Sequence, residues 1–324
     1  MLSLIAQAIS SAMNLSQGKS TVQPQDKTKA EIRHIIEKFL SDCHLDFAIV
    51  PFEKEFYQEC CDEVLRRGYS MGTEEHSLRR CLHVGVGITT TAYAHLPRRD
   101  TQMFIAIYTG LLVYVDDACQ RDVNLVKQFN RRFITGQPQA DPILDSLAKH
   151  LHEFPDHYDP FVADLMLTST LNFITAQVLE WELKSMRVPN DANKFLSFTR
   201  ILSGASEPFA LFVFPADIPF QSHIHSLPEV MVYSTEANDV FSYYKEVVAG
   251  ETANYVSTVA NCRQVSKIEA LRILADDIAA ASNLAVKMLK NCPEAHEAYL
   301  KFAQGYADFH FSSPRYKLED LFRD

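Results

Sequence analysis

The sequence predicts an all-α fold in one domain, and three observations support this prediction. The 324 residues are 47% hydrophobic and 22% charged, so the chain can bury a large core. Ten glycines and fourteen prolines are too few for a chain with many tight turns. From about residue 27 onward, apolar residues recur at spacings of three and four, which is the period of an amphipathic helix.

The predicted helices follow one another without a Gly/Ser linker or an internal repeat, so 27–324 is expected to form one helical domain. The preceding residues, 1–26, are expected to form a separate, mobile N-terminal segment. Helices 74–95 and 159–186 are apolar around much of their circumference, which is typical of a central bundle helix surrounded by neighbours. The full set of predicted helices is 28–41, 52–67, 74–95, 99–115, 121–134, 140–153, 159–186, 190–202, 205–212, 228–249, 266–290, 294–311 and 315–323.

Composition excludes several classes of partner. The net charge of −10, from 41 acidic and 31 basic residues, repels a nucleic-acid backbone. The seven cysteines form no C-x-x-C pair and no Cys/His spacing suited to zinc, so reduced and mostly buried thiols are expected. The chain starts without the basic segment and cleavage site of a signal peptide, and no apolar run approaches the roughly 18 residues of a membrane span. We therefore expect a cytoplasmic protein with no nucleic-acid partner and no integral membrane span.

The first candidate for chemistry is a pair of carboxylates, Asp116 and Asp117, at the end of the predicted helix 99–115. Two anions beside an apolar run destabilise the fold unless a cation or solvent accepts them. Paired aspartates at a helix end are also common on solvated surfaces, so this segment alone leaves both interpretations open.

The second candidate lies within the predicted helix 228–249. Asn238, Ser242 and Glu246 are spaced at i, i+4 and i+8, which places an amide, a hydroxyl and a carboxylate on one helix face over roughly 12 Å. Such oxygen ligands suit a hard cation such as Mg²⁺, whose remaining positions are filled by water and substrate phosphate. Lys245 beside them is a candidate phosphate contact. An ordinary polar stripe is the alternative, but the helix is otherwise largely apolar, and buried polar groups need partners.

The third candidate is Arg315-Tyr316, which follows Ser313-Pro314 near the C-terminus. Serine can cap a helix and proline favours its first turn, so the next side chains are presented at a helix start. A guanidinium fork and a phenol suit a diphosphate. By itself, the pair is more typical of an ordinary surface.

Taken together, the three motifs resemble the trichodiene synthase-like family of fungal class I terpene cyclases in order and spacing, over roughly residues 100–322. The resemblance implies an α-helical bundle around a central apolar cavity. It also implies that three Mg²⁺ ions hold a prenyl diphosphate at the open end of that cavity.

The resemblance assigns roles to individual residues. Asp116 is expected to bridge metal ions from one helix wall, while Asn238, Ser242 and Glu246 chelate a third ion from the opposite wall. Contacts to the diphosphate are implied for Arg200, Lys245, Arg315 and Tyr316.

The family also has an arginine that senses the diphosphate, followed three and four residues later by a break in the helix. Arg200, followed by Ser203 and Gly204, looks like that arrangement, and a small residue permits the break.

The acidic motif departs from the family pattern, which commonly reads Asp-Asp-x-x-Asp. The fifth position is Gln120, with Asp122 two residues further on. Asp116 is therefore the residue carried over. Asp117 has the alternative of pairing with Arg315, and whether Asp122 compensates for Gln120 is left open.

Four residues are predicted to line the cavity. Ile105, Tyr108 and Leu112 lie about three, two and one turns before Asp116 on its face of the helix, and Phe309 comes from the C-terminal helix. The rings of Tyr108 and Phe309 can stabilise a carbocation without attacking it. Core packing is the alternative for all four.

These expectations predict a Mg²⁺-dependent terpene synthase that ionises a prenyl diphosphate, with farnesyl diphosphate as the expected substrate, and cyclises the carbocation to a sesquiterpene hydrocarbon or alcohol. Two alternatives stay open. A prenyltransferase would need a second Asp-rich motif, whose place is taken in this chain by the Asn/Ser/Glu set. An inactive, cyclase-like interaction protein would account for the missing fifth-position aspartate. The sequence leaves open the product, the quenching of the cation by water and the assembly, for which a homodimer has precedent in the family.

Overall fold

The computed structural model of the chain describes residues 26–73, 75–183, 192–252 and 254–323, together with residues 186 and 189. The N-terminal segment expected at 1–26 therefore lies almost wholly outside the described residues. The described part folds into α-helices and short 3₁₀ helices with no β-strand, which confirms the all-α prediction.

Helices follow one another along the whole described chain. In order they are α2 (Asp26–Asp42), α3 (Lys54–Arg66), α4 (Leu78–Thr89), α5 (Arg99–Arg121), α6 (Val123–Lys127), α7 (Phe129–Ile134), α8 (Pro142–His150), η2 (Leu151–Glu153), α9 (Phe154–His157), α10 (Pro160–Glu182), α11 (Asn193–Ser203), α12 (Ser206–Leu211), η3 (Phe220–Ser222), η4 (Ile224–Ser226), α13 (Leu227–Val248), α14 (Tyr255–Arg263), α15 (Lys267–Leu289), α16 (Pro293–Ser312), η5 (Pro314–Tyr316) and α17 (Leu318–Phe322).

Side-chain caps fix several helix starts. Ser266 accepts a hydrogen bond from the backbone N–H of Glu269 at the start of α15, and Asp141 and Asp159 cap α8 and α10 in the same way. Proline occupies the first turn of both α8 and α10. These caps satisfy N–H groups that have no partner inside the helix, which is why the helices begin at these residues.

Some predicted boundaries are corrected by the structure. Helix α5 continues five residues beyond Asp116 to Arg121, so the acidic pair lies inside the helix and not at its end. The predicted helix 121–134 is divided into α6 and α7, and 140–153 is divided into α8 and η2. Helix α4 begins at Leu78, because Ser77 caps it, and ends at Thr89.

Two further corrections concern the C-terminal half. No helix was predicted over 250–265, but α14 forms there behind an Asn254 cap that accepts from the N–H of Ser257. The predicted helix 315–323 is interrupted at Lys317, whose φ of 57° is left-handed, and becomes η5 and α17.

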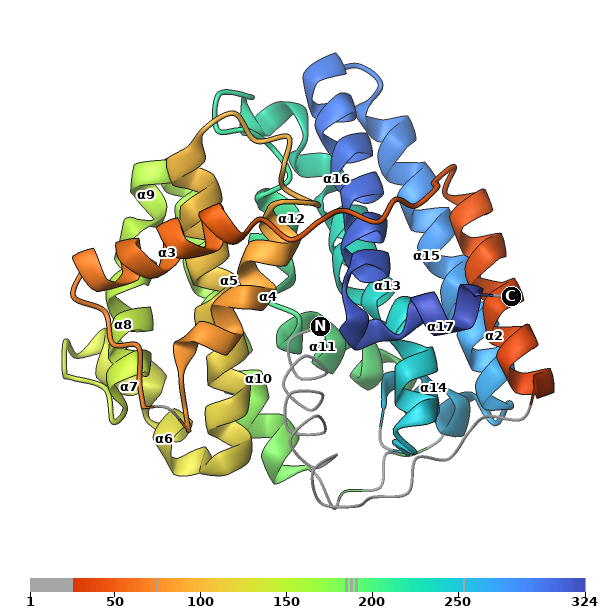
Figure 1. Cartoon of the computed structure of the whole chain (residues 1–324), viewed down its shortest axis with the longest axis horizontal. Helices are drawn as coiled ribbons and strands as arrows, with labels where there is room; N and C mark the ends of the chain where they lie inside the picture. Colours follow the sequence, from red (N-terminus) through yellow and green to blue (C-terminus); the bar gives the residue numbers. More distant parts are fainter. Residues whose placement is uncertain are drawn as a thin grey trace.

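The interior is built on two sets of packed helices. Helix α4 packs along α5, and α13 packs against α15 and α12. In Figure 1, α2 and α15 form the right flank and α7, α8 and α9 the left flank. The backbones of α4 and α5 come close enough that a Cβ on Gly85 would lie 2.0 Å from the carbonyl oxygen of Ala106. Glycine is therefore required at this crossing.

Two helices, α5 and α10, are long and apolar enough to cross a membrane by length and composition alone. Most of the apolar window of α5, 83%, is buried inside the protein, as is 50% of the window of α10. A buried core helix meets the same criteria of length and composition.

Candidate active site

The wall contributed by α5 carries Asp116, which is only 2% exposed. The side chain of Gln120, at the fifth position of the acidic motif, donates a hydrogen bond from Nε2 to Asp116 Oδ1 at 3.4 Å. Asp122 has a different task. Its carboxylate accepts from the backbone N–H of Asn124 at 3.0 Å and caps α6. In this structure its carboxylate holds the start of the next helix, and whether Asp122 also compensates for Gln120 stays open.

Asp117 is half-buried on the same helix. The Cys81 thiol donates to its Oδ2 at 3.8 Å. Burial raises the pKa of Asp117 to about 6, and the charge of Arg315 opposes this rise. The charge of Arg315 therefore acts on Asp117, and pairing between the two side chains stays a prediction.

The opposite wall is α13, on which Asn238, Ser242 and Glu246 are each at most 1% exposed. Ser242 Oγ donates to Glu246 Oε1 at 2.6 Å, and Lys245 Nζ lies 3.9 Å from the same oxygen. Burial raises the pKa of Glu246, and Lys245 opposes this rise. The predicted face is therefore formed, and it holds a carboxyl group with little access to solvent.

The amide of Asn238 has a defined set of neighbours. Its Nδ2 lies 3.0 Å from His310 Nε2 and 3.3 Å from the Tyr316 hydroxyl. Its Oδ1 is buried and has no hydrogen-bond partner. Burial lowers the pKa of His310 to about 3, so the imidazole is neutral at neutral pH.

These residues fit a hard cation. A buried carbonyl oxygen without a partner costs free energy, and a divalent ion satisfies it while also stabilising an ionised Glu246. Among the residues that the structure describes, no three His, Cys, Asp or Glu side chains gather as a metal cluster. A metal at this site would therefore depend on the amide of Asn238 and the hydroxyl of Ser242 as well as on carboxylates.

Arg315 and Tyr316 connect the two walls. Tyr316 is 1% exposed, and its ring lies 5.6 Å from the Arg315 guanidinium and 6.0 Å from Lys245 Nζ. Burial lowers the pKa of Arg315, whereas nearby anions raise it. Those anions include Asp116 and Asp117 from α5 and Glu246 from α13. Charges from both acidic walls therefore act on this guanidinium.

Arg200 reaches the same region from α11. Its Nε donates to Asp239 Oδ2 at 2.8 Å, and its Nη2 donates to the carbonyl of Thr235 at 2.9 Å. Asp239 is adjacent to Asn238, so a buried ion pair fixes the guanidinium beside the helix α13 that carries Asn238. Contact between Arg200 and a diphosphate stays a prediction.

The chain breaks between α11 and α12 at the predicted position. Ser203 ends α11, Gly204 follows, and Ala205 adopts a left-handed φ of 46° before α12 begins. Ser206 Oγ donates to the carbonyl of Ile201 at 2.9 Å, and Thr235 Oγ1 donates to Ser206 Oγ at 2.9 Å. The break is thus attached to α13.

The residues predicted to line the cavity are all buried. Ile105, Tyr108 and Leu112 are fully enclosed, and Phe309 is 5% exposed. The Tyr108 hydroxyl is paired with Thr170 Oγ1 at 2.8 Å. In this structure these side chains form part of the hydrophobic core, and their role as cavity lining stays a prediction.

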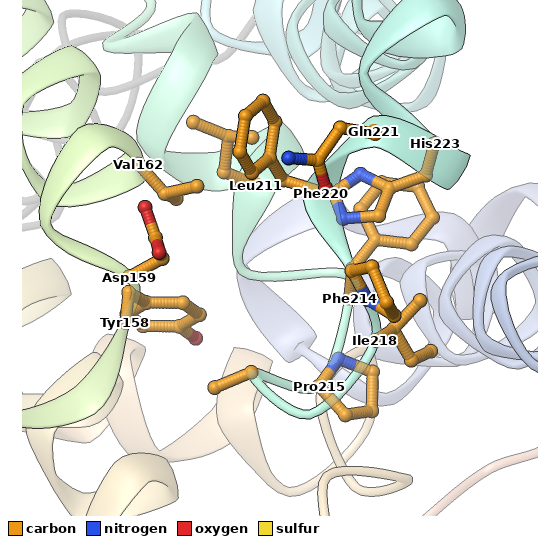
Figure 2. Close-up of a pocket in the computed structure, with 12 residues that line it drawn as sticks. Tyr158, Asp159, Val162, Leu211, Phe214, Pro215, Ile218, Phe220, Gln221 and His223 are labelled. Atoms are coloured by element: carbon orange, nitrogen blue, oxygen red, sulfur yellow. The ribbon is translucent and has the colours of Figure 1, made fainter.

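A pocket of about 250 Å³ lies elsewhere, between 158–162 and 211–223. Figure 2 shows Tyr158, Asp159 and Val162 facing Phe214, Pro215 and Ile218 across it. Gln177, whose carbonyl accepts from the Cys119 thiol of α5, lies roughly 22 Å along α10 from Val162. The pocket is therefore remote from Asp116 and Asp117 on α5. Its walls contain none of the four residues predicted to line the cavity.

Sequence reasoning missed two residues of the site, His310 and Asp239. His310 lies five positions before Arg315 and belongs to no ligand motif, so only its contact with Asn238 reveals it. Asp239 follows Asn238 directly. A carboxylate on a largely buried helix needs a cation, and this requirement could have linked Asp239 to Arg200.

Known proteins resemble this chain in sequence. A family model described as trichodiene synthase (TRI5) matches residues 65–324, so the similarity begins earlier than the motifs indicated. Alpha-cuprenene synthase COP6 of Coprinopsis cinerea is 36% identical over 297 residues, which cover 91% of each chain. Terpene synthase BipA of Cochliobolus sativus is 34% identical over 253 residues, 76% of this chain and 77% of that one.

Solved structures share the fold at lower identity. The structure of 2-methylisoborneol synthase from Streptomyces coelicolor, in complex with Mg²⁺ and 2-fluoroneryl diphosphate, has a TM-score of 0.62 at 15% identity. The similarity covers 84% of this chain and 96% of that one.

Proposed function

This chain belongs to the trichodiene synthase family, and from that premise we propose that it is a Mg²⁺-dependent cyclase that converts farnesyl diphosphate into a sesquiterpene hydrocarbon or alcohol and releases diphosphate. The observation that carries the proposal is Asn238 Oδ1, a buried oxygen without a hydrogen-bond partner on the same helix face as the buried Glu246 carboxyl. The choice of a fifteen-carbon substrate follows the precedent of the family.

Each wall has a distinct task in this proposal. Asp116 holds metal from α5, while Asn238, Ser242 and Glu246 hold metal from α13. Bound Mg²⁺ supplies positive charge that stabilises the diphosphate as the allylic C–O bond ionises. The residues proposed to orient the diphosphate are Arg200, Lys245, Arg315 and Tyr316.

After ionisation, the protein must exclude water and fold the substrate chain. Water that reaches the carbocation quenches it, so the remaining walls need to be apolar and closed. Tyr108 and Phe309 are proposed to offer aromatic faces to the cation. The break at Gly204 is proposed to present a backbone carbonyl to the reacting carbon, as the family arrangement implies.

The proposal is tested by incubating purified protein with farnesyl diphosphate, with Mg²⁺ or with EDTA, and analysing the headspace by gas chromatography and mass spectrometry. We expect a sesquiterpene product only with Mg²⁺. Parallel incubations with geranyl and geranylgeranyl diphosphate test the chain length. Absence of product with all three substrates in Mg²⁺ contradicts the proposal and favours the inactive interaction protein.

The prenyltransferase alternative requires a separate incubation. Isopentenyl diphosphate is added together with each allylic diphosphate, and the products are analysed for longer prenyl diphosphates. We expect none, because the Asn/Ser/Glu set replaces the second Asp-rich motif.

A further inference from the structure

The orientation of the Asn238 amide is set by a neighbour outside the predicted motifs. The amide can be rotated by 180° about its last side-chain bond, which exchanges a carbonyl oxygen for an NH₂ group. Only the carbonyl oxygen can bind a cation. In the structure, Nδ2 faces His310 Nε2 at 3.0 Å, and Oδ1 points away from this contact without a hydrogen-bond partner.

His310 can only accept in this contact. Its other ring nitrogen, Nδ1, lies 2.7 Å from the carbonyl oxygen of Tyr306. A carbonyl has no proton to donate, so Nδ1 carries the proton of the neutral ring and Nε2 presents a lone pair. An Asn238 amide turned the other way would place Oδ1 against this lone pair and would lose the hydrogen bond.

The ring of His310 is itself held in place. It is fully buried, its centroid lies 4.8 Å from that of Phe241 in a stacked arrangement, and it lies 4.4 Å from the ring of Tyr316. Phe241 belongs to α13, the helix that carries Asn238, whereas His310 belongs to α16. The histidine therefore links the two helices with little rotational freedom.

We propose that His310 is a positioning residue for metal binding, which accepts a hydrogen bond from Asn238 Nδ2 and so keeps Asn238 Oδ1 directed at the cation. The inference rests on the proposed function, because it concerns the same metal. It assigns to His310 a role in binding and none in the chemical step. Groups that orient a metal ligand in this way typically change metal affinity by about 10- to 100-fold when removed.

The test compares two replacements of His310. His310→Gln retains a neutral side chain whose carbonyl oxygen accepts from Asn238 and whose NH₂ group remains a donor. His310→Phe retains a planar ring between Phe241 and Tyr316 but has no acceptor. Tyr299→Phe is the matched control, because it removes a buried hydrogen bond from the same helix, from Tyr299 Oη to Ser282 Oγ at 2.9 Å.

Two quantities are measured on the full chain. The first is the Mg²⁺ concentration that gives half-maximal binding of inorganic diphosphate, by isothermal titration calorimetry. The second is the melting temperature in EDTA. We expect His310→Phe to raise the required Mg²⁺ concentration about 10-fold or more. We expect His310→Gln and Tyr299→Phe to stay within about threefold of the natural protein.

The outcomes separate the possible failures. An unchanged Mg²⁺ requirement in His310→Phe overturns the inference. Equal shifts in His310→Phe and His310→Gln also overturn it, because they indicate a packing role. A natural protein that binds no diphosphate at any Mg²⁺ concentration instead contradicts the proposed function. If His310→Phe does not fold, His310→Asn takes its place, since its shorter side chain can still donate to the Tyr306 carbonyl but does not reach Asn238.

Discussion

Asp116 and Asp122 lie six residues apart, and their surroundings differ. Asp116 is almost fully buried, and its charge acts together with that of Glu246 on Arg315. Asp122 is exposed and caps α6. A buried carboxylate in an acidic wall favours a bound cation, whereas an exposed cap acts only on the helix that it begins.

The two aspartates should therefore respond differently to the same substitution. We expect Asp116→Ala to lower turnover by 100-fold or more, an order-of-magnitude loss of about 2.7 kcal/mol in transition-state stabilisation. Asp122→Ala should keep its activity and lose about 0.5–2 kcal/mol of stability, because α6 loses its cap. Steady-state kinetics and urea unfolding on both variants test this. Loss of activity in Asp122→Ala with the fold intact would mean that Asp122 compensates for Gln120.

A second prediction at this scale concerns α13. Asn238→Ala and Glu246→Ala each remove one of the oxygen ligands proposed for the metal, so turnover should fall by at least about 100-fold. Melting temperatures in EDTA should change little compared with the loss of activity. Full activity in both variants, measured at limiting Mg²⁺, would be incompatible with the metal assignment.

The sequence predicted the proposed metal ligands better than it predicted the residues that hold those ligands in place. Asn238, Ser242 and Glu246 share a helix face because the period of a helix is fixed, so spacing alone predicts their proximity. His310 and Asn238 meet only because α16 packs near α13, and no local pattern encodes that contact. A lone histidine therefore remained unassigned until the tertiary structure placed it.

At the scale of elements, the α11–α12 break depends on close packing against α13. A Cβ added to Gly204 would lie 2.5 Å from Thr235 Cγ2 and 2.7 Å from Ser206 Oγ. Thr235 also donates the hydrogen bond that attaches Ser206 to α13. The same threonine thus both restricts and stabilises the break.

A double-mutant cycle tests this arrangement. We expect Gly204→Ala to destabilise the protein by about 1–3 kcal/mol, because the new methyl group overlaps with Thr235. Thr235→Ser removes Cγ2 and keeps the hydroxyl, so the combined variant should recover at least about 0.5 kcal/mol of that loss. Urea unfolding gives the four free energies. Strict additivity would show that the overlap with Thr235 is not the source of the loss.

Helix boundaries were predicted less well than helix existence. The break at Gly204 was predicted from small residues, whereas α14 was missed because its short sequence has no strong apolar period. Its Asn254 cap was a usable signal. The end of α5 was placed too early because Asp116 and Asp117 are typical of a helix terminus, yet their burial within the helix results from tertiary packing.

At the scale of the whole molecule, the all-α architecture could be predicted from composition and periodicity. A largely apolar chain with helical spacing forms amphipathic helices, which must bury their apolar faces against one another. The convergence of α5, α13 and η5 on one site could not be predicted from spacing, because it depends on how distant helices pack. The same packing buries histidines as neutral groups, which makes the free energy of unfolding depend on pH.

His150 is the clearest case because it lies far from the proposed metal ligands in the sequence and is fully buried. Its Nε2 contacts the carbonyl of Phe104 at 3.1 Å, and burial lowers its pKa to about 3. Glu153 lies 4.0 Å from its Nδ1, and Arg67 and His157 also act on it. In the unfolded chain, the pKa of a histidine is about 6.5.

The unfolded chain therefore takes up a proton on His150 at a pH at which the folded protein leaves this histidine neutral. The stability that His150 contributes is thus present above about pH 6.5 and is lost as the pH falls toward 3. Between pH 7.5 and pH 5 the loss amounts to about 2 kcal/mol. His150→Gln can still donate to the Phe104 carbonyl but takes up no proton, so its free energy of unfolding should fall less over this interval than that of the natural protein. The exposed His152, substituted in the same way, is the control and should keep the full pH dependence. Urea unfolding at both pH values measures the difference, and equal losses in His150→Gln and the natural protein would contradict the burial of a neutral imidazole at this position.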